Sequence, residues 1–277
     1  MRRVKLGLIG GNIRASRSPA LHRIAGEMAG LAVTYDLLIP DEMGMDLDAV
    51  LDWCGANGFA GVNVTYPYKE AVVPRVTLAD PALRRLGAVN TVLFGPAGLA
   101  GHNTDFTGFA AAFRARYGTA APGPVAMIGA GGVGRAIAFA LAGLGAAELR
   151  LVDSDPAKVA ALAAALAGQG MAVRPAASAA EALEGARGVI NATPVGMVGQ
   201  PGTPVPAALW PGRVWAFDAV YTPSDTRFLQ EAAAAGVDCL SGWELFFHQG
   251  IEAFRLFTGV RVSDTAALRA ALLALPG

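Results

Sequence analysis

The feature that most restricts the fold of this chain is a glycine-rich turn between an apolar run and an amphipathic stretch. Residues 129–134 read GAGGVG, after the apolar run PVAMI and before GRAIAFALAGLG. A second apolar run, ELRLVD, ends at Asp153. Strand, glycine turn, helix and a second strand ending in an acid are typical of the βαβ unit that binds dinucleotides. The pattern therefore predicts a Rossmann-type domain, and the alternative is a strand–turn–helix that holds no ligand.

The glycines of this turn have separate tasks in such a unit. Gly129 permits the tight turn, Gly131 lets the backbone approach a pyrophosphate, and Gly134 lets the helix pack on the strand. The helix N-terminus then faces the negative charge. The cofactor-binding residues predicted for the turn are Gly129, Ala130, Gly131, Gly132, Val133 and Gly134.

Asp153 favours NAD as the cofactor over NADP. A carboxylate at this strand end accepts hydrogen bonds from the ribose hydroxyls of NAD and repels the 2′-phosphate of NADP. The next residues, SDPAK, add a second acid, Asp155, and no arginine that could hold a phosphate. NADP remains the less favoured possibility, and Asp153 could also cap the helix that follows.

Apolar strands alternate with amphipathic helices through most of the chain, which predicts an α/β fold with mainly parallel sheets. Ahead of the glycine turn we expect a helix that starts with Ser18 as its N-cap and a helix near 46–56. The pattern is purely helical after about residue 240. The strands expected ahead of the turn are 4–9, 33–39, 60–64 and 88–94.

Composition and charge argue against several classes of protein. The chain has 22 basic and 22 acidic residues, so we expect no basic surface for nucleic acid or for an anionic membrane. No long uncharged apolar stretch reads as a membrane span, and the N-terminal apolar run is too short for a signal peptide. The two cysteines lie in apolar segments and the three histidines are far apart. We expect a reduced, cytoplasmic protein without a metal site.

Short polar motifs follow several of the expected strands in the first part of the chain. They read ASRSPALH (15–22), NVTYPYKE (63–70), GAVNTV (87–92) and GHNTDFTGF (101–109). Ligands of open α/β sheets bind beyond the carboxyl ends of the strands. If these strands are parallel, Asn63, Thr65, Asn90 and Asp105 meet at one edge, and such side chains suit a polyhydroxylated molecule.

Lys69 is chemically unusual in this chain, because only three of the 22 Lys and Arg residues are lysines. Lysine can release a proton at accessible pH, whereas arginine cannot. A lysine after a strand end could therefore be an acid–base group, or it could be a solvated surface residue.

The four motifs closely resemble those of the shikimate/quinate dehydrogenase family, and are most similar to its NAD-dependent quinate/shikimate branch. The family pattern contains S-x-S-P, N-V-T-x-P-x-K, G-A-V-N-T and N-T-D-x-x-G in this order. The resemblance continues through GAGGVG, INATPVGM (190–197) and HQGIEAFRLFTG (248–259). It implies reversible NAD(P)-dependent oxidation of shikimate or quinate to the 3-dehydro ketone, by a monomer or homodimer with a small-molecule substrate.

The resemblance also implies roles for individual residues. Lys69 and Asp105 become the catalytic pair, with Asp105 orienting the amine and favouring its charged form. The residues implied to bind the substrate are Ser16, Ser18, Thr65, Asn90, Gln249 and, with a weaker match, Tyr221. The further cofactor contacts are Asn191, Thr193, Val220 and Gly242.

The resemblance also implies three parts of the chain. Residues 1–104 form the substrate-binding and catalytic domain, 105–239 the Rossmann domain, and 240–277 helices that pack back on the first domain. The Gly- and Pro-rich stretch 117–125 separates the two series of strands and is the best boundary on composition alone.

Two segments depart from the family pattern. NADP-using members tend to carry a basic N-R-T-like clip where this chain has VDSDP. Members often show D-G-x-G-M where this chain has Ser241, Glu244 and Leu245, and we expect Glu244 near the nicotinamide or the substrate. The alternatives are a related dehydrogenase acting on another small polyol or an amino-shikimate, and a non-catalytic nucleotide-sensing relative.

Overall fold

The computed structural model describes residues 1–275, which divide into two compact units. Unit 1 contains residues 1–104 and the segment that starts at Gln249, and unit 2 contains residues 105–248. Residues 240–248, grouped above with the C-terminal helices, thus belong to unit 2. The Gly- and Pro-rich stretch 117–125 also lies inside unit 2, as the connection between a helix and a strand.

Unit 1 is built on a five-stranded sheet of order β2-β1-β3-β4-β5. Strand β1 pairs in parallel with β2 and β3, whereas β4 runs antiparallel to both β3 and β5. The sequence pattern predicts no strand at 98–102, where β5 forms a hairpin with β4. The strands are β1 (Arg2–Ile9), β2 (Leu31–Leu38), β3 (Gly61–Val64), β4 (Thr91–Gly95) and β5 (Gly98–His102).

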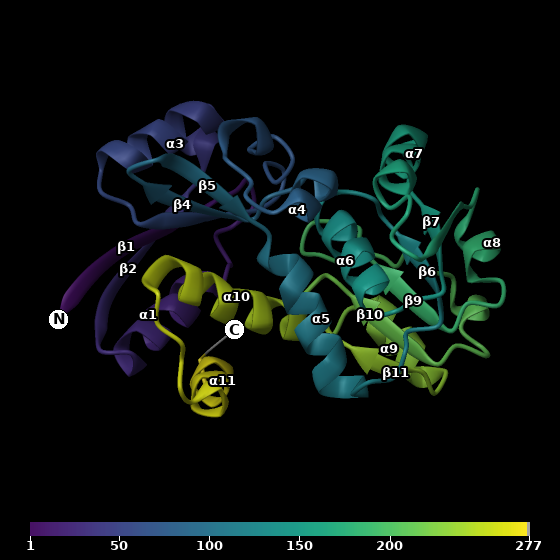
Figure 1. The fold of residues 1–277 in the computed structure, drawn as a ribbon. Coiled ribbons are helices and arrows are strands. Elements are labelled where there is room, and N and C mark those ends of the chain that lie inside the picture. The colour runs from purple at the N-terminus through teal and green to yellow at the C-terminus, as the bar shows by residue number, and fades with distance from the viewer. Residues whose placement is uncertain (276–277) are drawn as a thin grey trace. The chain divides into compact units, whose positions relative to one another are not determined.

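Helices cover both faces of the unit 1 sheet, as Figure 1 shows for α3 on one face and α1 on the other. A Cβ on Gly61 of β3 would lie 2.4 Å from Phe257, so the late turns of α10 pack on the α1 face. The next residue, Val62, is in the core cluster with Leu51 of α3. This alternation is that of a strand buried on both faces. The helices are α1 (Ser18–Met28), α2 (Pro40–Met43), α3 (Leu47–Ala56), α4 (Pro81–Leu86), α10 (Gly242–Thr258, from Gln249 on) and α11 (Thr265–Leu273).

Unit 2 contains a six-stranded sheet of order β11-β10-β9-β6-β7-β8, and all of its pairings are parallel. The chain builds from β6 out to β8 on one side, then returns to β9 and builds out to β11 on the other. This doubly wound order confirms the predicted Rossmann-type fold. The strands are β6 (Pro124–Ile128), β7 (Glu148–Val152), β8 (Ala172–Pro175), β9 (Gly188–Asn191), β10 (Trp215–Asp218) and β11 (Asp238–Leu240).

The core of unit 2 lies on both faces of this sheet. Ala216 of β10 packs in a cluster with Phe228 of α9. On the opposite face, Phe217 meets Phe109 of α5 edge to face, with ring centroids 5.0 Å apart. The helices are α5 (Thr104–Tyr117), α6 (Gly132–Gly143), α7 (Pro156–Ala165), α8 (Ala179–Leu183) and α9 (Arg227–Ala234). Within residues 1–275, no helix has both the length and the apolar character needed to cross a membrane.

Candidate functional site

The glycine turn 129–134 joins β6 to α6 at the point where the strand order of unit 2 reverses. Gly129 has a φ of 108°, and a Cβ there would lie 2.6 Å from the backbone of Ala192. A Cβ on Gly134 would lie 2.3 Å from the carbonyl oxygen of Gly129. A Cβ on Gly131 would meet nothing within 4 Å. The turn therefore needs glycine at 129 and 134 for its own packing, whereas at 131 it leaves open space in front of the start of α6.

Asp153, directly after β7, holds this turn. Its Oδ2 accepts the N–H of Ala130 at 2.7 Å, and its Oδ1 accepts the N–H of Asp155 at 2.9 Å. Helix α7 is capped by Asp155, whose Oδ1 accepts the N–H of Ala157 at 2.9 Å. The alternative that Asp153 caps this helix is therefore wrong, and its carboxylate lies beside the turn instead.

On the other side of the switch point, Asn191 organises the loop that follows β9. Thr193 donates its hydroxyl to Asn191 Oδ1 at 2.7 Å and its N–H to the same atom at 3.0 Å. Asn191 Nδ2 donates to the carbonyl oxygen of Val195 at 2.9 Å and to Asp218 Oδ1 at 3.0 Å. The side chain of Asn191 thus connects its own loop to the end of β10.

Val220 and Gly242 lie at the end of β10. The N–H of Val220 donates to Asp218 Oδ1 at 2.9 Å. A Cβ on Gly242, the first residue of α10, would lie 2.7 Å from the carbonyl oxygen of Val220. The structure therefore gathers the cofactor residues predicted at 191, 193, 220 and 242 around the ends of β9 and β10.

Asp218 is a buried acid that none of the motifs singled out, although it stands in the otherwise apolar run VWAFDAV. Burial raises its pKa to about 6, and hydrogen bonds from Thr226, Val220 and Asn191 oppose the shift. The available signal was an ionisable residue inside a strand buried on both faces.

Tyr221 and Glu244 both lie in unit 2. The ring of Tyr221 stacks on that of Phe246, with centroids 4.9 Å apart and planes 15° apart. Glu244 lies half-buried in the first turn of α10.

In unit 1, Ser16 and Ser18 lie together at the start of α1. Ser18 is the first helical residue and the cap position is Arg17, which makes no side-chain cap bond, so the predicted N-cap at Ser18 is wrong. Ser16 Oγ accepts the N–H of Ser18 at 3.2 Å and donates to Ser18 Oγ at 3.1 Å. The two hydroxyls therefore meet at a helix N-terminus, where the helix dipole favours a negative charge.

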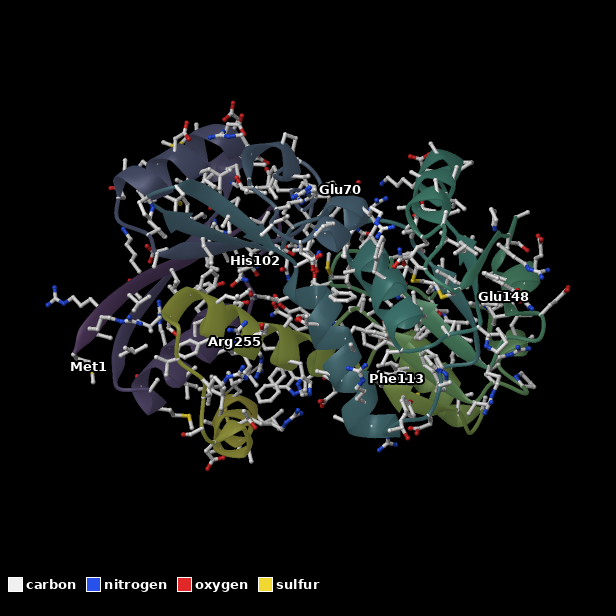
Figure 2. All side chains as sticks on the ribbon, in the orientation of Figure 1. Met1, Glu70, His102, Phe113, Glu148 and Arg255 are labelled. Carbon is white, nitrogen blue, oxygen red and sulfur yellow. The ribbon has the colours of Figure 1, made fainter. Side chains whose placement is uncertain are left out.

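The loops that carry Thr65 and Lys69 are held by backbone contacts. Thr65 donates its N–H to the carbonyl oxygen of Ile9 at 2.9 Å. A Cβ on Gly10 would lie 2.5 Å from Thr65 Cγ2, so the segment that leads to Ser16 passes directly against Thr65. The carbonyl oxygen of Lys69 accepts the N–H of Val89 at 2.8 Å. Figure 2 labels Glu70, the residue after Lys69.

Asn90 is buried and bonded to the residue that precedes Asp105. Its Oδ1 accepts the N–H of Thr104 at 2.7 Å, and its Nδ2 donates to Thr104 Oγ1 at 3.0 Å. Thr104 Oγ1 in turn lies 3.2 Å from Gln249 Oε1. The motifs did not lead us to Thr104, although it stands within N-T-D. The structure thus brings Asn90 and Gln249 together through Thr104.

The direction of β4 explains why these polar motifs gather. Thr91, the first residue of β4, pairs with Asn63 near the end of β3. Asn63 Nδ2 donates to Thr91 Oγ1 at 3.1 Å and to the carbonyl oxygen of Asn90 at 3.2 Å. The motifs meet because an antiparallel β4 starts where β3 ends, and the parallel arrangement assumed from the sequence is wrong for this pair.

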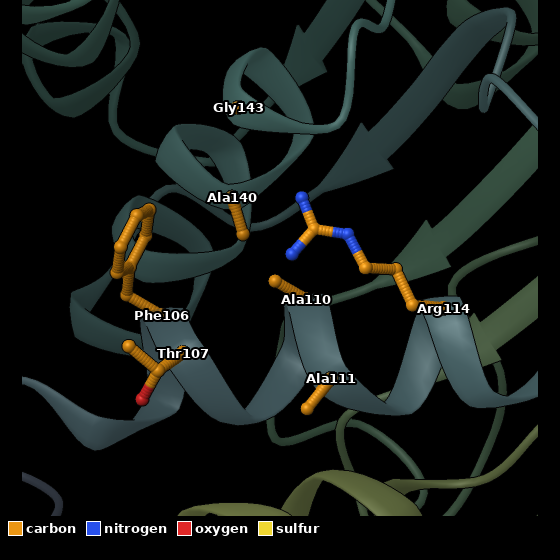
Figure 3. Close-up of a pocket in the computed structure, with 7 residues that line it drawn as sticks. All are labelled: Phe106, Thr107, Ala110, Ala111, Arg114, Ala140 and Gly143. Carbon is orange, nitrogen blue, oxygen red and sulfur yellow. The ribbon is translucent and has the colours of Figure 1, made fainter. Parts of the chain in front are cut away.

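A hollow of about 290 Å³ lies between α5 and α6 in unit 2 (Figure 3). None of the residues that line it was predicted as a site residue, and small side chains there leave the space between the two helices. The residues that line the hollow are Phe106, Thr107, Ala110, Ala111, Arg114, Ala140 and Gly143. Across the described chain, no cluster of three or more His, Cys, Asp or Glu residues could hold a metal ion.

Known proteins resemble this chain over nearly its full length. A model of the shikimate dehydrogenase substrate binding domain matches residues 8–92. The quinate/shikimate dehydrogenase (NAD(+)) of Corynebacterium efficiens is 40% identical over 283 residues, which cover 98% of each chain. The quinate dehydrogenase of Corynebacterium glutamicum in complex with NAD is 36% identical with a TM-score of 0.89, covering 99% of this chain and 100% of that one. The shikimate 5-dehydrogenase of Thermus thermophilus in complex with NADP(H) and shikimate is 36% identical with a TM-score of 0.83, covering 98% of each.

Proposed function

The chain belongs to the shikimate/quinate dehydrogenase family, and from this premise we propose that it oxidises shikimate or quinate reversibly to the 3-dehydro ketone with NAD. One observation carries the proposal. The family's polar motifs gather at one edge of the unit 1 sheet, and unit 2 presents a glycine turn with an acid at the end of the next strand.

The carboxyl ends of the strands in unit 2 suit NAD as the cofactor. The open space in front of Gly131 and the N-terminus of α6 suit a pyrophosphate, and Asp153 beside the turn suits the adenosine ribose. No arginine follows Asp153 in the stretch SDPAK. A 2′-phosphate would therefore lie beside the carboxylate of Asp153, with no arginine in this segment to bind it. NAD is therefore preferred over NADP. When bound, the cofactor supplies the hydride acceptor.

Lys69 and Asp105 carry the proton step of the proposed reaction. Lys69 Nζ accepts the proton of the substrate hydroxyl during oxidation and returns it to the carbonyl oxygen during reduction. Asp105 orients the amine for this transfer. Two contacts support this pairing: Val89 is bonded to the backbone of Lys69, and its neighbour Asn90 is bonded to Thr104, which directly precedes Asp105.

The substrate residues divide by the part of the molecule that they hold. Ser16 and Ser18 bind the carboxylate, which suits two hydroxyls at the N-terminus of α1. The residues proposed for the ring hydroxyls are Thr65, Asn90, Gln249 and Tyr221. We place the protein in the cytoplasm, as a monomer or a homodimer.

The test follows NADH by its absorbance band. The protein is incubated with NAD⁺ and, separately, with shikimate, quinate and an amino-substituted shikimate, and the series is repeated with NADP⁺. We expect NADH with shikimate or quinate. Turnover of only the amino-substituted shikimate would indicate the related dehydrogenase. Binding of NAD⁺ without turnover of any substrate would favour the nucleotide-sensing alternative.

A further inference from the structure

Asp218 is an acid with no role in the proposed chemistry, yet it is the last residue of β10 and is fully buried. Its Oδ2 accepts the hydroxyl of Thr226 at 2.5 Å. Its Oδ1 accepts from Asn191 Nδ2 at 3.0 Å and from the N–H of Val220 at 2.9 Å. All three donors are neutral groups. A buried carboxylate costs free energy, which hydrogen bonds of this kind reduce.

Each donor fixes a different piece of backbone. Asn191 also binds the carbonyl oxygen of Val195, so it fixes the loop 192–197 after β9. Val220 and Thr226 stand at the two ends of the segment 219–226 after β10. Thr226 also caps α9, because its Oγ1 accepts the N–H of Leu229 at 3.3 Å. One carboxylate thus connects two loops that are far apart in the sequence.

With NAD bound as proposed, the topology of the sheet indicates which part of the cofactor lies beside these loops. A dinucleotide lies across the switch point of a doubly wound sheet, with its pyrophosphate at the turn after the first strand. That turn follows β6, and Asp153 marks the adenosine side at the end of β7. The nicotinamide half therefore extends over the ends of β9 and β10, where the loops 192–197 and 219–226 begin.

We propose that Asp218 is a positioning residue for the nicotinamide ring of NAD, acting through its hydrogen bonds to Asn191, Val220 and Thr226. By holding the loops 192–197 and 219–226 in one arrangement, it preforms the surface that receives the ring. The inference rests on the proposed NAD-dependent function. We expect its effect to be larger on the nicotinamide half, because the turn 129–134 is joined to Asp153 by a hydrogen bond of its own, while only Gly129 and Gly134 of the turn pack against Ala192 at the start of the loop 192–197.

Asp218→Asn tests the proposal, since the amide keeps an oxygen for Val220 and Asn191 but turns an NH₂ group toward Thr226. The affinities for NAD⁺ and for ADP-ribose, which lacks the nicotinamide ring, are measured by titration calorimetry. We expect the Kd for NAD⁺ to rise about 10- to 100-fold, the scale of a lost charge-assisted hydrogen bond. The Kd for ADP-ribose should stay within about twofold of wild type, since distant sites contribute independently.

The matched control is Asp225→Asn, which removes an exposed carboxylate from the same segment. The carbonyl oxygen of Asp225 binds Gln230, and the substitution leaves that backbone contact in place. This control should bind both ligands as wild type does. Equal loss of both ligands in Asp218→Asn, or loss of neither, would overturn the proposal. Failure of the wild-type protein to bind either ligand would instead defeat the proposed function, and the inference with it.

A second pair of variants covers the case in which Asp218→Asn does not fold. Thr226→Val keeps the shape of the side chain and removes the hydroxyl, whereas Thr226→Ser keeps the hydroxyl. We expect Thr226→Val to lose affinity for NAD⁺ but not for ADP-ribose, and Thr226→Ser to retain both. A Thr226→Val protein that binds NAD⁺ as tightly as wild type would overturn the positioning role.

Discussion

At the scale of single residues, some of the predicted site side chains already form hydrogen bonds within the protein. Asn90 and Asp153 are bonded to the backbone of Thr104 and Ala130, so each also has a structural role in the absence of ligand. A substitution there changes the local fold and the proposed chemistry together. Variants at this scale therefore need controls that separate charge, contact and proton transfer.

Lys69→Arg separates proton transfer from charge. Arginine keeps the positive charge but cannot release a proton. We expect kcat for alcohol oxidation to fall by about 10²- to 10⁴-fold, the usual worth of a general acid–base group. The affinity for NAD⁺, followed by fluorescence titration, should not change. The control is Lys158→Arg, an exposed lysine on α7, which should be fully active. An active Lys69→Arg enzyme would rule out the acid–base role of Lys69.

Asp153→Ala tests the choice of cofactor. The preference for NAD⁺ over NADP⁺, measured as the ratio of kcat/KM values with saturating shikimate, should narrow by about 1–2 kcal/mol, the scale of one charge-assisted hydrogen bond. Asp155→Ala is the comparison, because it removes the second acid of this segment, whose side chain caps α7, and it should narrow the preference less than Asp153→Ala does. A wild-type preference for NADP⁺ would refute the assignment.

His22 links stability to pH in unit 1. Its ring is buried and stacks on Tyr35 with centroids 4.8 Å apart, and its Nδ1 has no hydrogen-bond partner among the residues described. Burial lowers its pKa from 6.5 to about 3, partly offset by a hydrogen bond with Asn63. The unfolded chain therefore binds the proton first, and this contribution to stability is lost as the pH falls from 6.5 toward 3.

His22→Phe keeps a ring at this position but cannot titrate. Between pH 6.5 and pH 5, we expect wild type to lose up to about 2 kcal/mol more stability than the variant, measured by urea unfolding. The comparison must be between the two proteins, because the raised pKa of Asp218 acts in the opposite direction below pH 6. Above pH 7.5 the difference in stability should be constant. Parallel curves at all pH values would contradict the prediction.

At the scale of elements, the segment β6–turn–α6 contains glycines that we expect to be needed for two different reasons, packing and ligand approach. Position 134 needs glycine because a Cβ would strike the carbonyl oxygen of Gly129. Position 131 has an ordinary φ of −75° and space for a Cβ, so the fold alone does not require glycine there. The space at 131 is compatible with the pyrophosphate contact that we propose for this residue.

Gly134→Ala and Gly131→Ala should therefore fail in different ways. Gly134→Ala should lower the free energy of unfolding by about 1–3 kcal/mol, as overpacking does. Gly131→Ala should keep the Tm of wild type and weaken NAD⁺ binding by about tenfold or more, because its methyl group occupies the place of the pyrophosphate. Thermal unfolding and NAD⁺ titration of both variants check this. Normal NAD⁺ binding by Gly131→Ala would argue for a turn that holds no ligand.

At the scale of the whole molecule, the two units differ in how the chain builds them. Unit 2 is one continuous segment, whereas unit 1 needs both ends of the chain. The rings of Phe254 and Phe257, on the late turns of α10, lie 6.1 Å and 5.7 Å from that of His22. Arg17 Nη1 also donates to the carbonyl oxygen of Leu272 in α11 at 3.0 Å. Residues 1–104 alone therefore lack one side of their core.

Fragments of the chain should reflect this difference. A fragment of residues 105–248 should unfold cooperatively and bind ADP-ribose, because its sheet and glycine turn are complete. A fragment of residues 1–104 should show no cooperative transition, because apolar surface that the C-terminal helices bury would be exposed. Circular dichroism during heating distinguishes the two, with the full chain as the reference. A cooperative transition in the 1–104 fragment would contradict the prediction.

Local requirements were predictable from the sequence. The packing of Gly134 on Gly129, the acid at the end of β7 and the alternation of strands and helices depend on neighbours in the chain, so motif and period suffice to predict them. These features predicted the Rossmann-type sheet of unit 2. The motifs around Lys69, Asn90 and Asp105 similarly indicated a family and a substrate class before any geometry was known.

Long-range partners were decided only by the tertiary structure. Strand periodicity does not specify whether β4 runs parallel or antiparallel to β3, because both directions place alternate side chains on opposite faces. The contact of Asn90 with Thr104 follows from that direction. The satisfaction of buried Asp218 likewise depends on donors from the end of β9, the loop after β10 and the cap of α9, which no local pattern connects. Local sterics act within a few residues, whereas strand pairing and the satisfaction of a buried charge are settled by packing across the whole unit.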